Sequence, residues 1–145
     1  MPRPQTNSYL EVQVQTASKE QLLVMLYDGA IRFCQLAQQH LENEDIEASH
    51  NNLIRAKAII VELMCSLDKK IGDPLYSNLI SLYNFIYLRL VEANFNKSVS
   101  SLVEALEILQ HLRSTWEQAI EKSSAEGNNQ TYNQAPKASS FNIQG

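Results

Sequence analysis

The sequence predicts an all-α fold: an antiparallel, up-down-up-down four-helix bundle with a short N-terminal capping segment and a disordered C-terminal tail. Three observations lead to this prediction. Apolar residues recur at helical spacing in four successive stretches of similar length. The 145 residues include four glycines and four prolines, too few turn-forming residues for many short strands. Short polar turns separate the stretches, and such turns make neighbouring helices antiparallel.

The chain begins with a polar segment, residues 1–17, which we expect to be mobile because its apolar side chains are isolated. The first helix is predicted over residues 18–41. Ser18 and Gln21 have the spacing of a capping box at its start. Its apolar face consists of Leu22, Leu26, Ala30, Phe33 and Ala37.

The second helix is predicted over residues 46–68, after a polar turn in which Asp45 serves as N-cap. The face that we expect in the core consists of Ile46, Leu53, Ile60, Leu63, Met64 and Leu67. A further apolar stripe on the same helix consists of Ile54, Ala58, Val61 and Cys65.

The third helix is predicted over residues 74–95. Asp73 as N-cap and Pro74 as the first helical residue predict its start, and Gly72 before them is available for a left-handed backbone. This helix carries two apolar stripes. The first, expected to face the core, consists of Leu75, Leu79, Leu82, Ile86 and Leu90. The second consists of Tyr76, Ile80, Tyr83, Tyr87 and Val91.

The fourth helix is predicted over residues 98–122, with Ser98 as its cap. Its apolar face consists of Leu102, Leu106, Leu109, Leu112, Trp116 and Ile120. Ser, Asn and Gln dominate residues 123–145, which we expect to form a disordered polar tail. The predicted domain organisation is therefore an N-terminal segment, a bundle over residues 18–122 and a tail.

The second stripe of the third helix is more apolar surface than one core requires, so it has to be covered by something else. Tyrosine is enriched at protein interfaces, which favours a partner protein as the cover, although a wide apolar face can also be core. The N-terminal segment could also cover such a groove internally. The candidate partner-binding residues are Tyr9, Leu10, Tyr27, Ile54, Ala58, Tyr76, Ile80, Tyr83, Tyr87, Val91 and Val103.

Several classes of function are disfavoured. The formal net charge is −4 without a basic cluster, which argues against nucleic acid and anionic membranes as partners. The start resembles no signal peptide and no run is apolar enough to span a membrane, so we expect a cytoplasmic protein. Cys34 and Cys65 are predicted to be free thiols, too far apart to pair. One Glu-x-x-His pair, Glu47 and His50, is too little for a di-metal site, and no nucleotide-binding or nucleophile motif occurs; we expect neither cofactor nor enzymatic activity.

Several runs of residues closely resemble the flagellar secretion chaperone FliS family. The most specific is residues 21–31 (QLLVMLYDGAI), preceded by residues 16–18 (TAS). The others, in the same order as in the family, are residues 57–63 (KAIIVEL), 66–68 (SLD), 78–79, 82–83, 93–94 and 112–113, and Trp116. The resemblance covers residues 9–120 and leaves the tail outside.

This resemblance implies a function. FliS-like proteins bind the disordered C-terminal segment of flagellin in the cytoplasm, prevent its premature polymerisation, and present it to the membrane-embedded type III export gate. In that family the client wraps the bundle, and the N-terminal segment lies over one groove when no client is bound. The chain could also form a homodimer. We expect it not to insert into the membrane directly.

Two other classes of function stay open at this stage. A self-associating structural bundle would pair the extra stripe with itself. A histidine phosphotransfer domain would need an exposed mid-helix histidine beside a basic residue, and His111 near Arg113 is the best candidate.

Overall fold

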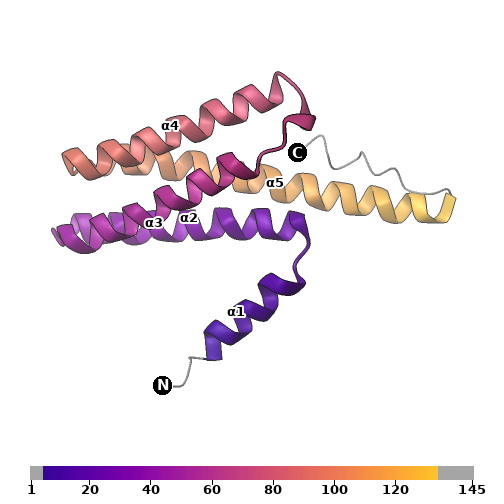
Figure 1. The fold of residues 1–145 in the computed structure, drawn as a ribbon, viewed down its shortest axis with the longest axis horizontal. Helices are drawn as coiled ribbons and strands as arrows, with labels where there is room; N and C mark the ends of the chain where they lie inside the picture. Colours follow the sequence, from indigo (N-terminus) through magenta and orange to yellow (C-terminus); the bar gives the residue numbers. More distant parts are fainter. Residues whose placement is uncertain (1–4, 134–145) are drawn as a thin grey trace.

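The computed structural model describes residues 5–133, and their side chains over residues 8–125. Within that range the protein is all-α, as predicted, and no strand is present. The elements in chain order are α1 (Gln5–Thr16), α2 (Lys19–Glu42), α3 (Ile46–Ser66), the 3₁₀ helix η1 (Lys69–Ile71), α4 (Leu75–Asn96) and α5 (Val99–Asn133), as labelled in Figure 1.

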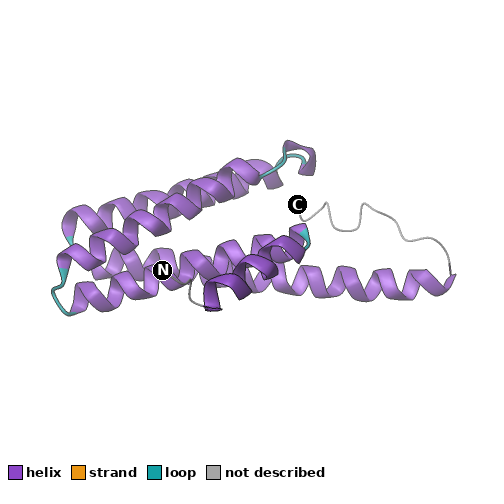
Figure 2. Cartoon of the chain, turned by 60° about the horizontal axis from the view of Figure 1, so that its bottom comes forward, coloured by secondary structure: helices purple, strands orange, loops and turns teal. Residues whose placement is uncertain are grey.

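Helices α2 to α5 lie alongside one another, as Figures 1 and 2 show, and all four contribute buried side chains to the core. α3 packs mainly against α2 and α4, and α5 packs mainly against the same two helices. We call these four helices the bundle. Its largest fully buried side chains are Tyr27, Tyr83, Leu53, Ile60, Leu63, Ile86, Leu90, Leu102, Leu109 and Cys34.

Three aromatic residues from three helices form a hydrogen-bonded network in the core. The hydroxyl oxygens of Tyr27 on α2 and Tyr83 on α4 lie 2.6 Å apart, and Trp116 Nε1 on α5 donates to the Tyr27 hydroxyl at 3.1 Å. Burial raises the pKa of both tyrosines. Tyr27 and Tyr83 are therefore buried in the core in this conformation, and their predicted role in partner binding stays a prediction. Their hydroxyls satisfy each other, which removes the main cost of burying a polar group.

The two residues after Tyr27 also join helices. The Asp28 carboxylate accepts a hydrogen bond from Arg113 Nε on α5. A Cβ atom on Gly29 would lie 3.1 Å from Ile59 Cδ1, so the absence of a side chain lets α3 approach α2 closely. The run Tyr27-Asp28-Gly29 therefore contacts α3, α4 and α5 from α2.

Three of the predicted helix starts are confirmed. Ser18 and Gln21 form both hydrogen bonds of a capping box, Asp45 Oδ1 accepts from Ala48 N, and Ser98 Oγ accepts from Ser101 N. These bonds satisfy backbone N–H groups that have no partner within their helices.

The start of α4 differs from the prediction. Pro74, not Asp73, is the residue before the helix, and no side chain caps its backbone. Asp73 lies one residue too early, and its carboxylate accepts from the Ser77 hydroxyl at 2.7 Å instead. Gly72 does have a positive φ, +83°, as its position suggested.

Both ends of the described chain contain more helix than the sequence analysis predicted. Residues 5–16 form α1, which makes few contacts with the bundle and points away from α4 in Figure 1. Its apolar residues alternate with polar ones and build no helical face, so the periodicity did not reveal it. α5 continues to Asn133, past the predicted end at residue 122. The remaining tail, residues 134–145, lies outside the described residues.

Candidate functional site

α4 is apolar on more sides than the bundle can cover. Its buried residues are Leu79, Tyr83, Ile86, Leu90 and Ala93. Leu82, predicted to face the core, is 36% exposed, so that prediction is wrong. The core-facing sector follows the 79, 83, 86, 90 spacing, which places Leu82 at its edge and Tyr83 at its centre.

The neighbouring helices α3 and α4 each carry a stripe of exposed and half-buried apolar residues, and we call the two stripes together the α3–α4 face. On α3 it consists of the exposed residues Ile54, Ala58, Val61 and Cys65. On α4 it consists of Tyr76, Ile80 and Tyr87, which are half-buried, and the exposed Val91. The separation of four, three and four residues along α3 is the helical repeat of one stripe.

One hydrogen bond fixes how the two helices lie against each other. Asn94 Nδ2 on α4 is 2.8 Å from His50 Nδ1 on α3. Because the helices are antiparallel neighbours, equal steps forward from His50 and backward from Asn94 reach the same level. Ile54 therefore lies near the level of Val91, and Ala58 near that of Tyr87.

The structure brings together six of the eleven predicted site residues on this face: Ile54, Ala58, Tyr76, Ile80, Tyr87 and Val91. Tyr27 and Tyr83 are in the core instead, and the half-buried Val103 lies on α5, whose main neighbours are α2 and α4. Tyr9 and Leu10 are exposed on α1. The binding role of the six gathered residues stays a prediction.

Several exposed apolar residues were absent from the predicted site. Val61 and Cys65 extend the α3 stripe, and the helical period does group them with Ile54 and Ala58. Three more lie on the outward side of α4, namely Phe85, Leu88 and Phe95, with Phe95 83% exposed. On a helix that is apolar on almost every side, helical periodicity cannot distinguish core-facing from exposed apolar residues, because no polar face marks the side toward water.

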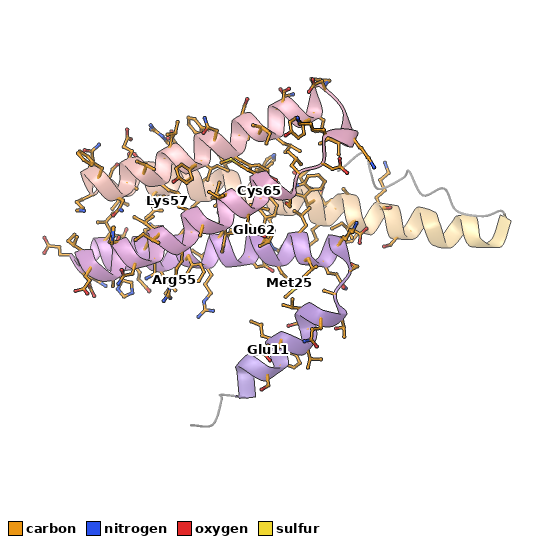
Figure 3. All side chains as sticks on the ribbon, viewed as in Figure 1. Glu11, Met25, Arg55, Lys57, Glu62 and Cys65 are labelled. Atoms are coloured by element: carbon orange, nitrogen blue, oxygen red, sulfur yellow. The ribbon has the colours of Figure 1, made fainter. Side chains whose placement is uncertain are left out.

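A separate hollow of about 520 Å³ lies where the end of α1 meets α2 and α5. Its lining is mixed, and consists of Gln13, Thr16, Ala17, Gln21, Val24, Met25, Glu117, Ile120 and Glu121. Figure 3 shows Met25 on the side of α2 that faces α1. In this conformation the N-terminal helix therefore meets the bundle away from the α3–α4 face.

The titratable side chains offer little chemistry. Both cysteines are free, as predicted, and burial raises the pKa of the Cys34 thiol to about 12, which keeps it protonated and unreactive. No group of His, Cys, Asp and Glu within the described residues could hold a metal ion. His111 is exposed on α5. No helix in the described part of the chain is long and apolar enough to cross a membrane.

Comparisons with known proteins point in one direction. The sequence model of the family described as "Flagellar protein FliS" matches residues 1–123. The chain is 37% identical to the flagellar secretion chaperone FliS of Bacillus subtilis over 114 residues, which cover 79% of this chain and 84% of that protein. Its identity to the Escherichia coli protein of the same name is 30%, covering 77% and 82%.

A solved structure described as "Crystal structure of flagellar chaperone from bacteria" is similar in fold. The TM-score is 0.68, and the match covers 82% of this chain and 99% of that one. Sequence identity is 19%, so this likeness concerns the fold alone.

Proposed function

The chain belongs to the FliS family of flagellar proteins, and from this premise we propose that it is a cytoplasmic export chaperone for flagellin. It binds the disordered C-terminal segment of flagellin, which we call the client, and prevents its premature polymerisation. It then delivers the client to the membrane-embedded gate of the flagellar type III export system.

The observation that carries this proposal is the α3–α4 face. Eight apolar or aromatic residues of two adjacent helices lie together there without complete cover from the rest of the described chain. An apolar face between two helices is a surface on which an amphipathic segment of another protein can lie with its own apolar residues inward. The half-buried Tyr76 and Tyr87 suit such an interface, since the ring offers apolar area and the hydroxyl can stay in contact with water.

The mechanism is coupled folding and binding. A disordered client loses conformational entropy when it is ordered on the bundle, and the burial of its apolar residues offsets that loss. The same residues are then unavailable for contacts between flagellin molecules. No reaction step is required, because release needs only a competing partner or a change in the position of the chaperone at the gate.

The experiment is a calorimetric titration of the full chain with an isolated flagellin C-terminal peptide. We expect binding with a negative heat-capacity change, and a gain of helix by circular dichroism beyond the sum of the two components. A peptide of the same composition in scrambled order is the control. A dissociation constant of roughly 50 μM corresponds to a binding free energy of about 6 kcal/mol. If the native peptide at this concentration shows no binding, the chaperone proposal is wrong.

A second candidate is self-association, which the outward apolar residues of α4 favour. Phe85, Leu88 and Phe95 lie outside the α3–α4 face and are exposed. Light scattering over a range of protein concentrations distinguishes this function. Self-association is excluded if the mass is that of one chain without the peptide and that of one chain plus one peptide with it. A dimer that dissociates when the peptide is added would place both functions on α4.

A further inference from the structure

One positively charged residue lies inside the α3–α4 face. Lys57 is half-buried on α3, two helical turns after His50. Because seven residues separate them, the two side chains lie on the same side of α3, and His50 bonds α4. Figure 3 shows Lys57 on the α4 side of α3 and Arg55 on the opposite side.

The surroundings of Lys57 are apolar, and the antiparallel register supplies one further polar group. Ile54, Ala58 and Val61 flank Lys57 along α3. Seven residues back from Asn94, α4 places Tyr87 at the level of Lys57. Neither the Lys57 ammonium nor the Tyr87 hydroxyl has a hydrogen bond or ion pair among the residues that the structure describes.

Other basic residues at helix contacts are partnered. Arg89 forms ion pairs with Glu92 and Glu104, and Arg113 with Asp28 and Glu117. A lysine stem can cover apolar surface while its ammonium group reaches water, so packing alone could keep Lys57 in place. Its ammonium is nevertheless a cation without a carboxylate, at the centre of a face that lacks a cover.

We propose that Lys57 determines which segments the face accepts, by pairing with the carboxylate of an Asp or Glu side chain set among apolar residues of the client. The Tyr87 hydroxyl is the second donor to that carboxylate. This inference rests on the proposed function and adds a chemical requirement to it. An apolar client covers the ammonium and removes it from water, which is costly unless the client brings an opposite charge.

The test compares variants that keep the shape of Lys57 and change its charge. Lys57→Met retains the unbranched stem, Lys57→Arg retains the charge, and Arg55→Met removes a charge from the opposite side of α3, where Arg55 stacks on Phe33 with 5.8 Å from Cζ to the ring centroid. The probe is the flagellin C-terminal peptide, titrated at low and high salt. Circular dichroism confirms that each variant is folded, and Lys57→Gln replaces the methionine variant if that one is not.

We expect Lys57→Met to weaken peptide binding by about tenfold or more, the range for a charge-assisted hydrogen bond, and to reduce its salt dependence. Arg55→Met and Lys57→Arg should bind like the original chain. Replacing the acidic residues of the peptide one at a time by their amides should identify one whose loss matters to the original chain and not to Lys57→Met.

The outcomes separate the two proposals. If the original chain binds and Lys57→Met binds equally well with the same salt dependence, the inference about Lys57 is wrong and the chaperone function stands. If no single acidic residue of the peptide couples to Lys57, the inference is also wrong. If the original chain does not bind the peptide, the proposed function and the inference that rests on it are both overturned.

Discussion

Tyr83 and Tyr87 lie one turn apart on α4 and have different environments. Tyr83 is buried, and its hydroxyl bonds that of Tyr27 in the core. Tyr87 is half-buried on the α3–α4 face and has no hydrogen-bond partner among the described residues. Four residues advance a helix by about 40° beyond one turn, and this small rotation separates the two environments. On a helix that is apolar on almost every side, the angle toward neighbouring helices distinguishes core from interface, and residue type does not.

The largest expected effect is on stability. Tyr83→Ala should lower the free energy of unfolding by about 3–5 kcal/mol, because it leaves a cavity and removes a partner of the Tyr27 hydroxyl. Tyr87→Ala should cost less, about 1 kcal/mol, because Tyr87 packs against the core but is only half-buried. Urea denaturation of both variants measures the difference. Equal losses would mean that Tyr87 belongs to the core and that the comparison is wrong.

The next effect is on peptide binding, where Tyr87 and not Tyr83 is expected to matter more. Tyr87→Ala should weaken binding of a flagellin C-terminal peptide by about 2 kcal/mol, as expected for an aromatic residue in the centre of an interface. Val103→Ala on α5 is the matched control, because Val103 is half-buried but lies apart from the α3–α4 face. If Val103→Ala weakens peptide binding as much as Tyr87→Ala does, the client occupies a surface other than the α3–α4 face.

Alkaline pH tests the core side of the comparison. Burial raises the pKa of Tyr27 and Tyr83 above the 10.0 of a free phenol. Above about pH 10 the unfolded chain releases these protons while the folded chain keeps them, so stability is fully present below that pH and falls as the pH rises further. Cys34 acts with the same sign between pH 9 and about 12.

Urea midpoints from pH 8 to 11 measure this trend. Tyr27→Phe should make the decline above pH 10 less steep. A decline of the same steepness in the variant and in the original chain would assign the alkaline instability to other groups.

The smallest effect concerns the N-terminal helix. Deleting residues 1–15 should change the free energy of unfolding by less than about 1 kcal/mol, because Tyr9, Leu10, Val12 and Val14 are exposed and the Ser18 cap remains. Binding of an apolar dye should increase as the hollow beside Val24 and Met25 opens. A fall of many degrees in the melting temperature would show that α1 belongs to the core.

The local signals of the sequence determined much of this protein. Helical periodicity predicted α2 to α5, and the short-range chemistry of Ser18, Asp45 and Ser98 located three helix starts. The stripe with Ile54 and Ala58 was also predictable, since residues four apart on one helix share a face. These features depend on residues within about one or two turns of each other, and the sequence displays such spacings directly.

The tertiary structure alone decided which apolar stripes are core. Whether Tyr83 faces inward depends on the directions from which α3 and α5 pack against α4. It also depends on Tyr27, whose ring and hydroxyl meet those of Tyr83 and whose hydroxyl accepts from Trp116. Lys57 and Tyr87 lie at the same level of α3 and α4, and this register likewise follows from the contact between His50 and Asn94. These partners lie 44 to 89 residues apart in the chain, and no local pattern records which of them meet. The physical reason is that periodicity gives the angle of a side chain about its own helix, while burial also depends on where the other helices lie.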